Sequence, residues 1–219
     1  MAREPVPGKV KTRLQPYLSL RQSATLYTAF LQDTMEQVLK VRSCTPFLAF
    51  SPLKAKGFFK TFAPGFKLMP QRGRDLGWRM QGIFERLIIS GHSPVIIIGS
   101  DIPTLPSAIL DQALESLKCS DLCFGPTSDG GYYLVGMNKL ISGIFDGIPW
   151  STSEVFDITL KNAARTAFSV SLLDEYSDID TYFGLKQLAV DLENLSTVTF
   201  GGIPHFTAQW LKENRSWLK

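Results

Sequence analysis

The chain has 219 residues, of which 44% are hydrophobic and 20% charged, so a disordered or fibrous protein is excluded and residues 1–219 fit one globular domain. The formal net charge of +3 is too small to favour nucleic acid as a partner. No apolar run approaches the length of a membrane span. We therefore expect a cytoplasmic protein that contacts neither a membrane nor nucleic acid.

The first third of the chain alternates between helical and extended patterns. A stripe of apolar residues predicts a helix over residues 19–41, and Ser19 with Gln22 forms a capping box at its start. An apolar run over residues 45–50 predicts a strand. Further elements expected here are a short helix at 58–62, a strand at 66–69, and a helix whose inner face carries Met80, Ile83, Phe84 and Leu87.

The run Val95–Ile98 is entirely β-branched, which is typical of a strand covered on both faces in a parallel sheet. After it, Pro106 opens a predicted helix, and strands are expected at 121–124 and 132–135 around the turn 128–131. A capping box at Ser151 and Glu154 predicts a helix that runs towards Arg165. The remaining expected elements are a strand at 168–173 and helices at 181–193 and 205–218. This alternation predicts a three-layer α/β/α fold with a mostly parallel sheet.

A basic segment near the start, PVPGKVKTRL at residues 5–14, is the first candidate for chemistry. The charge surplus of the whole chain lies in residues 1–13, which favours a small anionic ligand. Gly8 allows a close approach of the backbone, and Lys9, Lys11 and Arg13 can surround phosphate oxygens. The spacing is not that of a Walker A loop. A solvated basic arm is the alternative.

A carboxylate that directly follows the buried strand is the second candidate. Asp101 lies in GSDIP, and in sheets of this kind ligands bind at the carboxyl ends of strands. Mg²⁺ takes one or two carboxylates and shares substrate phosphates. Asp101 is therefore a candidate metal ligand, although it could instead cap the turn before Pro103.

Three further polar turns contain an aspartate. Asp129 lies in an Asp-Gly hairpin signal and could contact an acceptor. Asp75 and Asp180 could face a ligand or could merely cap the helices that follow them. Other chemistry has little support, because three scattered cysteines and two histidines fit neither a disulfide framework, nor a zinc site, nor histidine-based acid–base catalysis.

Six motifs occur in a characteristic order: PVPGKVKTRL, DLGWRM, GSDIPTLP, GPTSDGGYYLVG, IPWST and DIDT. Together they resemble a family of bacterial glycosyltransferase-like proteins, related to the nucleotide-diphospho-sugar transferases of the glycosyltransferase-A fold. The family is more distantly similar to phospholactate guanylyltransferase and to molybdenum cofactor cytidylyltransferase. The resemblance covers nearly the whole chain and implies this fold and a transferase.

The resemblance also implies roles for individual residues. Asp101 and Asp180 would bind Mg²⁺ or Mn²⁺, and Lys11, Arg13 and Asp101 would be catalytic. Tyr182 stands where related DIDTPEDL motifs carry proline, which leaves the carboxylate of Asp180 in place. The implied contacts of the nucleotide are Gly8, Lys9, Lys11, Arg13, Gly73, Asp75, Arg79 and Ser100. Those of the acceptor are Asp129, Gly130, Gly131, Tyr132 and Trp150.

We interpret the chain as a metal-dependent nucleotidyltransferase, in which an acceptor phosphate or similar oxyanion attacks the α-phosphorus of an NTP and pyrophosphate leaves. The density of cations in the first loop suits a triphosphate. One alternative is a glycosyltransferase that uses a nucleotide-diphospho-sugar, with Asp129 as the base. Another is a non-catalytic nucleotide-binding protein. The base, the acceptor and the oligomeric state, monomer or homodimer, stay open.

The residues before the basic segment differ from the fold that the chain resembles. There an apolar strand leads into this loop, whereas only Met1-Ala2-Arg3-Glu4 precede Pro5 here. We therefore expect a truncated first strand, a natural start upstream of Met1, and either a displaced N-terminal loop or a partner's segment in the empty track.

Overall fold

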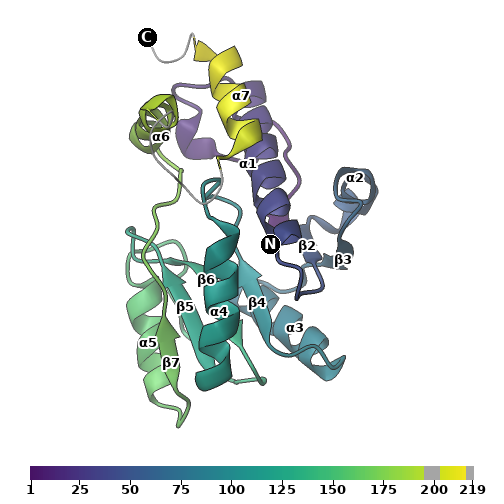
Figure 1. The fold of residues 1–219 in the computed structure, drawn as a ribbon, viewed down its shortest axis with the longest axis vertical. Helices are drawn as coiled ribbons and strands as arrows, with labels where there is room; N and C mark the ends of the chain where they lie inside the picture. The colour runs from purple at the N-terminus through teal and green to yellow at the C-terminus, as the bar shows by residue number, and fades with distance from the viewer. Residues whose placement is uncertain (195–202, 216–219) are drawn as a thin grey trace.

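The computed structural model describes residues 1–194 and 203–215, which form α/β/α layers around two sheets (Figure 1). The first sheet has three parallel strands: β1 (Ala2–Arg3), β2 (Phe47–Ser51) and β3 (Lys67–Pro70). The second has the order β4-β6-β5-β7, with β4 (Val95–Ile98), β5 (Leu122–Pro126), β6 (Tyr132–Met137) and β7 (Val170–Leu172). The predicted three-layer fold is confirmed.

The second sheet is mixed rather than purely parallel. β6 runs antiparallel to both β4 and β5, because the tight turn at residues 128–131 sends the chain straight back beside β5. The β-branched composition of Val95–Ile98 therefore indicated burial correctly, but the strand pairs with an antiparallel neighbour. β7 is parallel to β5.

Seven helices surround the sheets in the described residues: α1 (Leu20–Lys40), α2 (Lys56–Phe62), α3 (Leu76–Ile89), α4 (Ser107–Cys119), α5 (Val155–Ala164), α6 (Tyr182–Asn194) and α7 (His205–Glu213). The capping box of Ser19 and Gln22 at α1 is confirmed. The second predicted box is wrong: α5 begins after Glu154, and Ser151 has a positive φ of 71°, outside the extended region of an N-cap. Residues 216–218 of the predicted last helix lie outside the described residues.

Buried aromatic and aliphatic side chains hold the layers together. Phe30 of α1 packs in one group with Phe50 and Phe59, while Phe84 of α3 and Phe124 of β5 belong to a second group beside the mixed sheet. Figure 1 shows α7 beside α1 and α6 at the same end of the molecule, with α4 across the four-stranded sheet. Within the described ranges, no helix is both long and apolar enough to cross a membrane.

A buried aspartate ties α7 to α1. Asp33, 1% exposed, accepts hydrogen bonds from the backbone N–H of Phe206 at 2.9 Å and of Thr207 at 2.8 Å. These N–H groups belong to the first turn of α7 and have no partner within the helix. Asp33 therefore caps α7 from another element.

Replacement of Asp33 by alanine is expected to lower the free energy of unfolding by about 2 kcal/mol, because it leaves buried N–H groups without acceptors. Urea unfolding measures the change. Glu36→Ala is the matched control, since Glu36 lies on the same helix but its side chain is 46% exposed and forms a surface ion pair with Lys40. A loss no larger than that of the control would show that α7 docks without this cap.

The N-terminal residues have a defined place beside β2. Glu4 donates its N–H to the carbonyl of Ser51 at 2.8 Å, and the amino group of Met1 donates to the carbonyl of Ile98 at 2.6 Å. The expectation of a displaced loop is therefore wrong. The first strand is short, as expected, because β1 contains only Ala2 and Arg3.

Candidate functional site

Lys11 lies at the centre of a charged cluster at the carboxyl ends of the strands. Its Nζ is 2.6 Å from Oδ1 of Asp101 and 2.8 Å from Oδ1 of Asp180, and it donates to the carbonyl of Ile179 at 2.9 Å. Only 2% of its side chain is exposed. The ring of Phe30 lies 4.8 Å below the ammonium group. Three distant parts of the chain therefore meet at one cation.

Local structure holds each member of the cluster. Lys11 has φ 46° and ψ 45°, and this left-handed conformation turns the chain into the 3₁₀ turn Thr12–Leu14. Asp101 follows β4, and its carbonyl accepts the N–H of Ile179 at 2.9 Å, which fixes the segment that carries Asp180. The neighbouring Ser100 is buried and shares a hydrogen bond of 2.9 Å with the hydroxyl of Tyr27.

The charges in the cluster shift one another's pKa values. Burial alone would lower the pKa of Lys11, but Asp101 and Asp180 outweigh it and raise that pKa. Burial alone would raise the pKa of Asp180, yet Lys11 and Arg13 hold it below its ordinary value. For Asp178, burial and the carboxylates around it outweigh the opposing effect of Lys11 and raise its pKa to about 6. These shifts favour the ammonium form of Lys11 and the carboxylate form of Asp180.

The raised pKa of Asp178 predicts a pH dependence of stability. A carboxyl group whose pKa is higher in the folded protein stabilises the fold below its ordinary pKa of 3.8, and that contribution is lost as the pH rises through about 6. We therefore expect the free energy of unfolding of Asp178→Asn to fall less than that of the wild type between pH 3.8 and about 6. Urea unfolding without divalent metal measures this difference. Asp111→Asn, at an exposed position of α4, is the control. An unchanged slope in Asp178→Asn would contradict the assignment.

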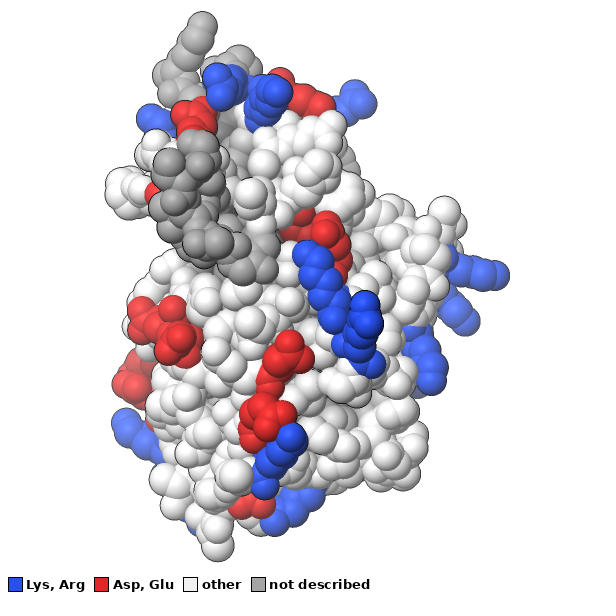
Figure 2. All heavy atoms as spheres, viewed as in Figure 1, with Lys and Arg blue, Asp and Glu red and all other residues white. Residues whose placement is uncertain are grey.

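A cavity of about 430 Å³ opens beside the cluster and brings the predicted basic segment together. Its lining residues are Arg3, Lys9, Val10, Lys11, Thr12, Arg13, Tyr27, Asp101, Ser151 and Asp180. The side chain of Arg13 is 64% exposed, and its Nη1 lies 4.0 Å from Oδ2 of Asp180. On the face in Figure 2, basic side chains stand in short groups beside acidic ones, without a continuous basic surface. The cavity suits a small anion.

Other predicted contacts lie in three cavities around this one. Ser100 and Arg79 line a cavity of about 310 Å³ that also contains Asp101. Asp129, Gly131 and Tyr132 line one of about 160 Å³ with Asp101 and Asp178. Asp101 therefore faces both the side expected for the nucleotide and the side expected for the acceptor.

Asp75 and Trp150 lie together in a cavity of about 360 Å³ whose lining does not include Asp101. Asp75 caps α3 by accepting the N–H of Trp78 at 2.9 Å, so the capping role considered from the sequence is present. Gly73 accepts a hydrogen bond from Nε of Arg79 at 3.2 Å. Gly8 and Gly130 have φ values of 80° and 87°, which favour glycine at both turns.

The cluster fits a divalent cation in part. The Lys11 ammonium is itself a cation that both Asp101 and Asp180 approach within 2.8 Å, so the two carboxylates converge on one point. Among the described residues, no three His, Cys, Asp or Glu side chains form a complete metal-binding group. Mg²⁺ commonly takes only one or two carboxylates and completes its shell with water and phosphate oxygens. The donor set therefore fits a cation that binds together with a phosphate.

The sequence interpretation did not assign a role to Arg3, Tyr27 or Asp178, which lie in these cavities. Asp178 belongs to the DIDT motif and could have been noticed there as a second carboxylate. Tyr27 gave no signal, because its hydroxyl reaches Ser100 from the middle of a regular helix.

Comparison with known proteins places the chain in a family. Residues 34–152 match the profile described as "Uncharacterized protein conserved in bacteria (DUF2064)". This match covers more than half of the 219 residues. The chain is a DUF2064 protein. No curated protein matches it.

Three solved structures share the fold of this DUF2064 protein. A protein from Desulfovibrio desulfuricans G20, provisionally named a nucleotide-diphospho-sugar transferase, has 31% identity and a TM-score of 0.88, over 99% of this chain and 94% of that one. A cytidylyltransferase from Leptospira borgpetersenii serovar Hardjo-bovis has 12% identity and a TM-score of 0.56, over 86% and 84%. CMP:2-keto-3-deoxy-manno-octonic acid synthetase, solved with CTP, has 10% identity and a TM-score of 0.55, over 76% and 88%.

These similarities confirm the predicted family relationship and the nucleotide-diphospho-sugar transferase fold. All three structures are named as synthetases or transferases, in agreement with the predicted enzyme class. The two neighbours with the lowest identity show the fold alone.

Proposed function

We propose that this DUF2064 protein is a nucleotidyltransferase that transfers NMP from an NTP to a small phosphate- or oxyanion-bearing acceptor with release of pyrophosphate. The observation that carries the proposal is the Lys11 ammonium between Asp101 and Asp180, at the edge of a cavity lined by Arg3, Lys9 and Arg13. The fold supports it, since two neighbours of the same fold are named for cytidylyl or CMP transfer.

The basic side chains of the cavity have the chemistry to bind a triphosphate. Arg3 and Arg13 can each offer a planar pair of N–H donors to phosphate oxygens, and Lys9 adds a point charge. Lys11 differs from the other three because it already has two carboxylate partners. Its predicted role as a direct phosphate ligand therefore requires that a cation or the nucleotide draws it away from at least one carboxylate.

Asp101 and Asp180 are the residues that would hold Mg²⁺ or Mn²⁺. A divalent cation bound there would neutralise charge on the phosphates. Lys11 and Arg13 are placed to stabilise the charge that grows on the phosphoryl oxygens, which is the main contribution a protein makes to such a transfer. An acceptor that is already an anion needs no general base, consistent with the absence of histidine from the cavity lining.

Glycosyl transfer from a nucleotide-diphospho-sugar is the second candidate. It is supported by the name of the relative that is 31% identical. Asp129 is the base that this reaction would use on an acceptor hydroxyl, and it shares a cavity with Asp101 and Tyr132. However, its Oδ1 already accepts hydrogen bonds from Thr127 at 2.6 Å and from the N–H of Gly131 at 3.1 Å, which favours a role in the turn.

A ligand panel tests the proposal and separates the two reactions. The four NTPs and a set of nucleotide-diphospho-sugars are added to the protein with and without Mg²⁺, and thermal unfolding is recorded. A ligand at a hundredfold its Kd adds about 2.7 kcal/mol of stability, which is roughly 5–10 °C for a domain of this size. A shift with one NTP that requires Mg²⁺ supports nucleotidyl transfer. Shifts with nucleotide-diphospho-sugars alone would favour glycosyl transfer, and no shift with either would refute both.

Within the basic segment, Arg13→Ala is expected to weaken NTP binding more than Lys9→Ala. Arg13 lies 4.0 Å from Asp180 and can bind a phosphate with two N–H groups, whereas Lys9 is exposed and offers a single point charge to the cavity. We expect about a tenfold or greater rise in Kd for Arg13→Ala, since a charge-assisted hydrogen bond contributes about 1.5–3 kcal/mol. Calorimetry measures both. A larger loss for Lys9→Ala would overturn the ranking.

A further inference from the structure

Two tryptophans line a cavity of about 360 Å³ between the start of α3 and residues 142–150. Trp78 of α3 is 58% exposed, and Trp150 is half-buried. Aromatic side chains around a concave surface, with a few polar groups among them, are typical of small-molecule sites. The cavity, called the tryptophan cavity below, is therefore a candidate for holding a ring of a ligand.

Contacts within the chain hold the wall that Trp150 forms. Gly77 is buried on α3, and a Cβ atom there would lie 2.8 Å from Cζ2 of Trp150, so glycine lets the indole pack against the backbone of the helix. The segment before Trp150 is tied to α5, because Nδ2 of Asn162 donates to the carbonyl of Asp146 at 2.8 Å. A wall built in this way lowers the entropic cost of binding a ligand.

The charges of the tryptophan cavity do not suit an anion. Nε of Arg74 lies 3.5 Å from Oδ2 of Asp75, so these two charges offset each other. The third charged side chain of the lining, Asp146, is exposed and forms no ion pair in the described part of the chain. A net negative lining repels phosphate. A phosphate therefore belongs in the neighbouring cavity of about 430 Å³, called the basic cavity below, which Lys9 and Arg13 line.

The polar side chains of the tryptophan cavity include both donors and acceptors. The indole N–H groups of Trp78 and Trp150 can only donate, the carboxylate of Asp146 only accepts, and the amide of Gln81 does both. Among residues 1–194 and 203–215, no hydrogen bond uses these four side-chain groups. An organic cation could serve only the acceptors, whereas hydroxyl groups donate and accept. The C–H faces of a sugar ring also pack well on the negative faces of indoles.

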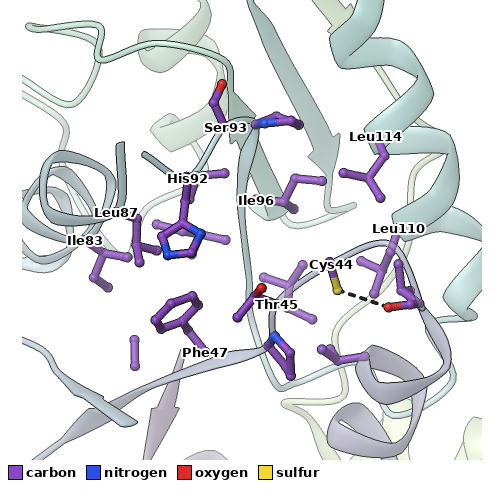
Figure 3. Close-up of a pocket in the computed structure, with 18 of the residues that line it drawn as sticks. Cys44, Thr45, Phe47, Ile83, Leu87, His92, Ser93, Ile96, Leu110 and Leu114 are labelled. Atoms are coloured by element: carbon purple, nitrogen blue, oxygen red, sulfur yellow. Dashed lines mark hydrogen bonds between the residues drawn. The ribbon is translucent and has the colours of Figure 1, made fainter. Parts of the chain in front are cut away.

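A cavity of similar size, about 330 Å³ between α3 and α4, has a different character (Figure 3). Its polar side chains include Cys44 and Ser93, which donate to the carbonyls of Val41 and Asn138 at 3.2 Å and 2.6 Å. Its walls contain many aliphatic side chains, among them Ile83, Leu87, Leu110 and Leu114. The tryptophan cavity differs because indole rings and polar groups without protein partners occur in it together.

The turn at residues 149–152 joins the tryptophan cavity to the basic cavity. Trp150 lines the first, and the next residue, Ser151, lines the second. Ser151 has a positive φ of 71°, and Oγ1 of Thr152 donates to the carbonyl of Pro149 at 2.8 Å across the turn. Because the Cα atoms of consecutive residues are about 3.8 Å apart, the two cavities come close together here. One small ligand can therefore reach both.

We propose that the tryptophan cavity binds the sugar ring of a phosphorylated monosaccharide whose phosphate enters the basic cavity. This inference names the class of the acceptor and so rests on the proposed function. An oxygen of the sugar's phosphate would bond to the α-phosphorus of the NTP as pyrophosphate leaves. Trp78, Gln81 and Asp146, none of which was predicted as a site residue, would select the ring together with Trp150.

Titrations followed by NMR of the ¹⁵N-labelled protein test the proposal, because the indole N–H groups of Trp78 and Trp150 give their own signals. Trp78→Leu and Trp150→Phe assign these signals. The probes are glucose 1-phosphate, mannose 1-phosphate, N-acetylglucosamine 1-phosphate and ribose 5-phosphate, each with and without Mg²⁺. Three other phosphates are the matched controls: glycerol 3-phosphate has hydroxyl groups but no ring, phosphocholine has a cation, and phenyl phosphate has an aromatic ring.

We expect at least one sugar phosphate to shift both indole signals at concentrations at which glycerol 3-phosphate shifts neither. Trp78→Leu and Asp146→Asn should each raise the Kd of that sugar phosphate about tenfold, through the lost ring contact and the lost acceptor. Both residues are exposed, so the variants should fold, and the rest of the NMR spectrum checks this. Ile89→Ala should leave the Kd unchanged, since Ile89 is on the same helix as Trp78, 76% exposed and outside the cavity lining.

The proposal is overturned if no sugar phosphate shifts either indole signal, or if phosphocholine or phenyl phosphate binds more tightly than every sugar phosphate. Sugar phosphate binding that survives unchanged in both Trp78→Leu and Asp146→Asn also overturns it, because the ring then lies elsewhere. The panel of NTPs separates this result from the proposed function. Binding of an NTP without any sugar phosphate refutes the sugar site alone, whereas sugar phosphate binding that depends on Trp78, without NTP binding, supports the site and refutes nucleotidyl transfer.

Discussion

Lys11→Met is expected to destabilise the protein by up to about 3 kcal/mol at neutral pH and to make its stability depend on divalent cations. The substitution removes the ammonium between Asp101 and Asp180 and leaves two carboxylates facing each other. Removing one member of a buried ion pair costs about 3–5 kcal/mol. We expect the lower end of that range or less, because the side chains of Asp101 and Asp180 are 44% and 34% exposed.

Millimolar Mg²⁺ should restore part of the lost stability in Lys11→Met, since the two carboxylates converge on a point that a divalent cation could occupy. The wild type should gain much less, because Lys11 already occupies that point. Urea unfolding with and without Mg²⁺ measures both effects. This experiment needs neither a nucleotide nor an identified acceptor, so it tests the carboxylate pair separately from the proposed reaction.

Arg13→Met is the matched control for charge. Arg13 also lies near Asp180, but its side chain is 64% exposed and the contact is 4.0 Å long. Exposed pairs of this kind contribute about 0–1 kcal/mol. If both variants lose the same stability, or if Mg²⁺ stabilises Lys11→Met no more than the wild type, the convergence of Asp101 and Asp180 has no electrostatic consequence.

The features predicted most accurately from the sequence are those that depend on residues close together along the chain. The capping box of Ser19 and Gln22, the hairpin around Asp129 and the buried strand Val95–Ile98 are each encoded within a few residues, and the structure contains all three. The failed capping box shows the limit of this reasoning. Ser151 has the right residue type, but its positive φ removes the extended geometry that a cap requires.

Tertiary pairing was harder to predict from local patterns. The apolar run of β4 reports that both faces are covered, but not whether the adjacent strand is parallel. Likewise, Lys11 and Asp180 are 169 positions apart, and no periodicity relates them. The family resemblance paired Asp101 with Asp180 as metal ligands, yet it assigned Lys11 to phosphate. The structure instead places the ammonium of Lys11 on those two carboxylates.

Asp101→Asn is expected to abolish metal-dependent nucleotide binding while the protein stays folded. The side chain of Asp101 is 44% exposed, and asparagine keeps its size and one oxygen acceptor for Lys11. The bond that fixes the Asp180 segment uses the backbone carbonyl of Asp101, which the substitution leaves in place. Stability should therefore change little, whereas the proposed metal site loses one of its two carboxylates.

For the same variant, we expect kcat/KM of the transfer to fall by at least about 100-fold, because a bound metal contributes several kcal/mol to such reactions and each 1.36 kcal/mol is a factor of ten. Calorimetry of the identified NTP with and without Mg²⁺, followed by a pyrophosphate-release assay, measures both effects. Asp174→Asn is the control, since Asp174 is exposed and lies outside the lining of the cavities that Asp101 borders. If Asp101→Asn binds NTP and Mg²⁺ as tightly as the wild type, Asp101 only supports the turn after β4 and the proposed mechanism is wrong.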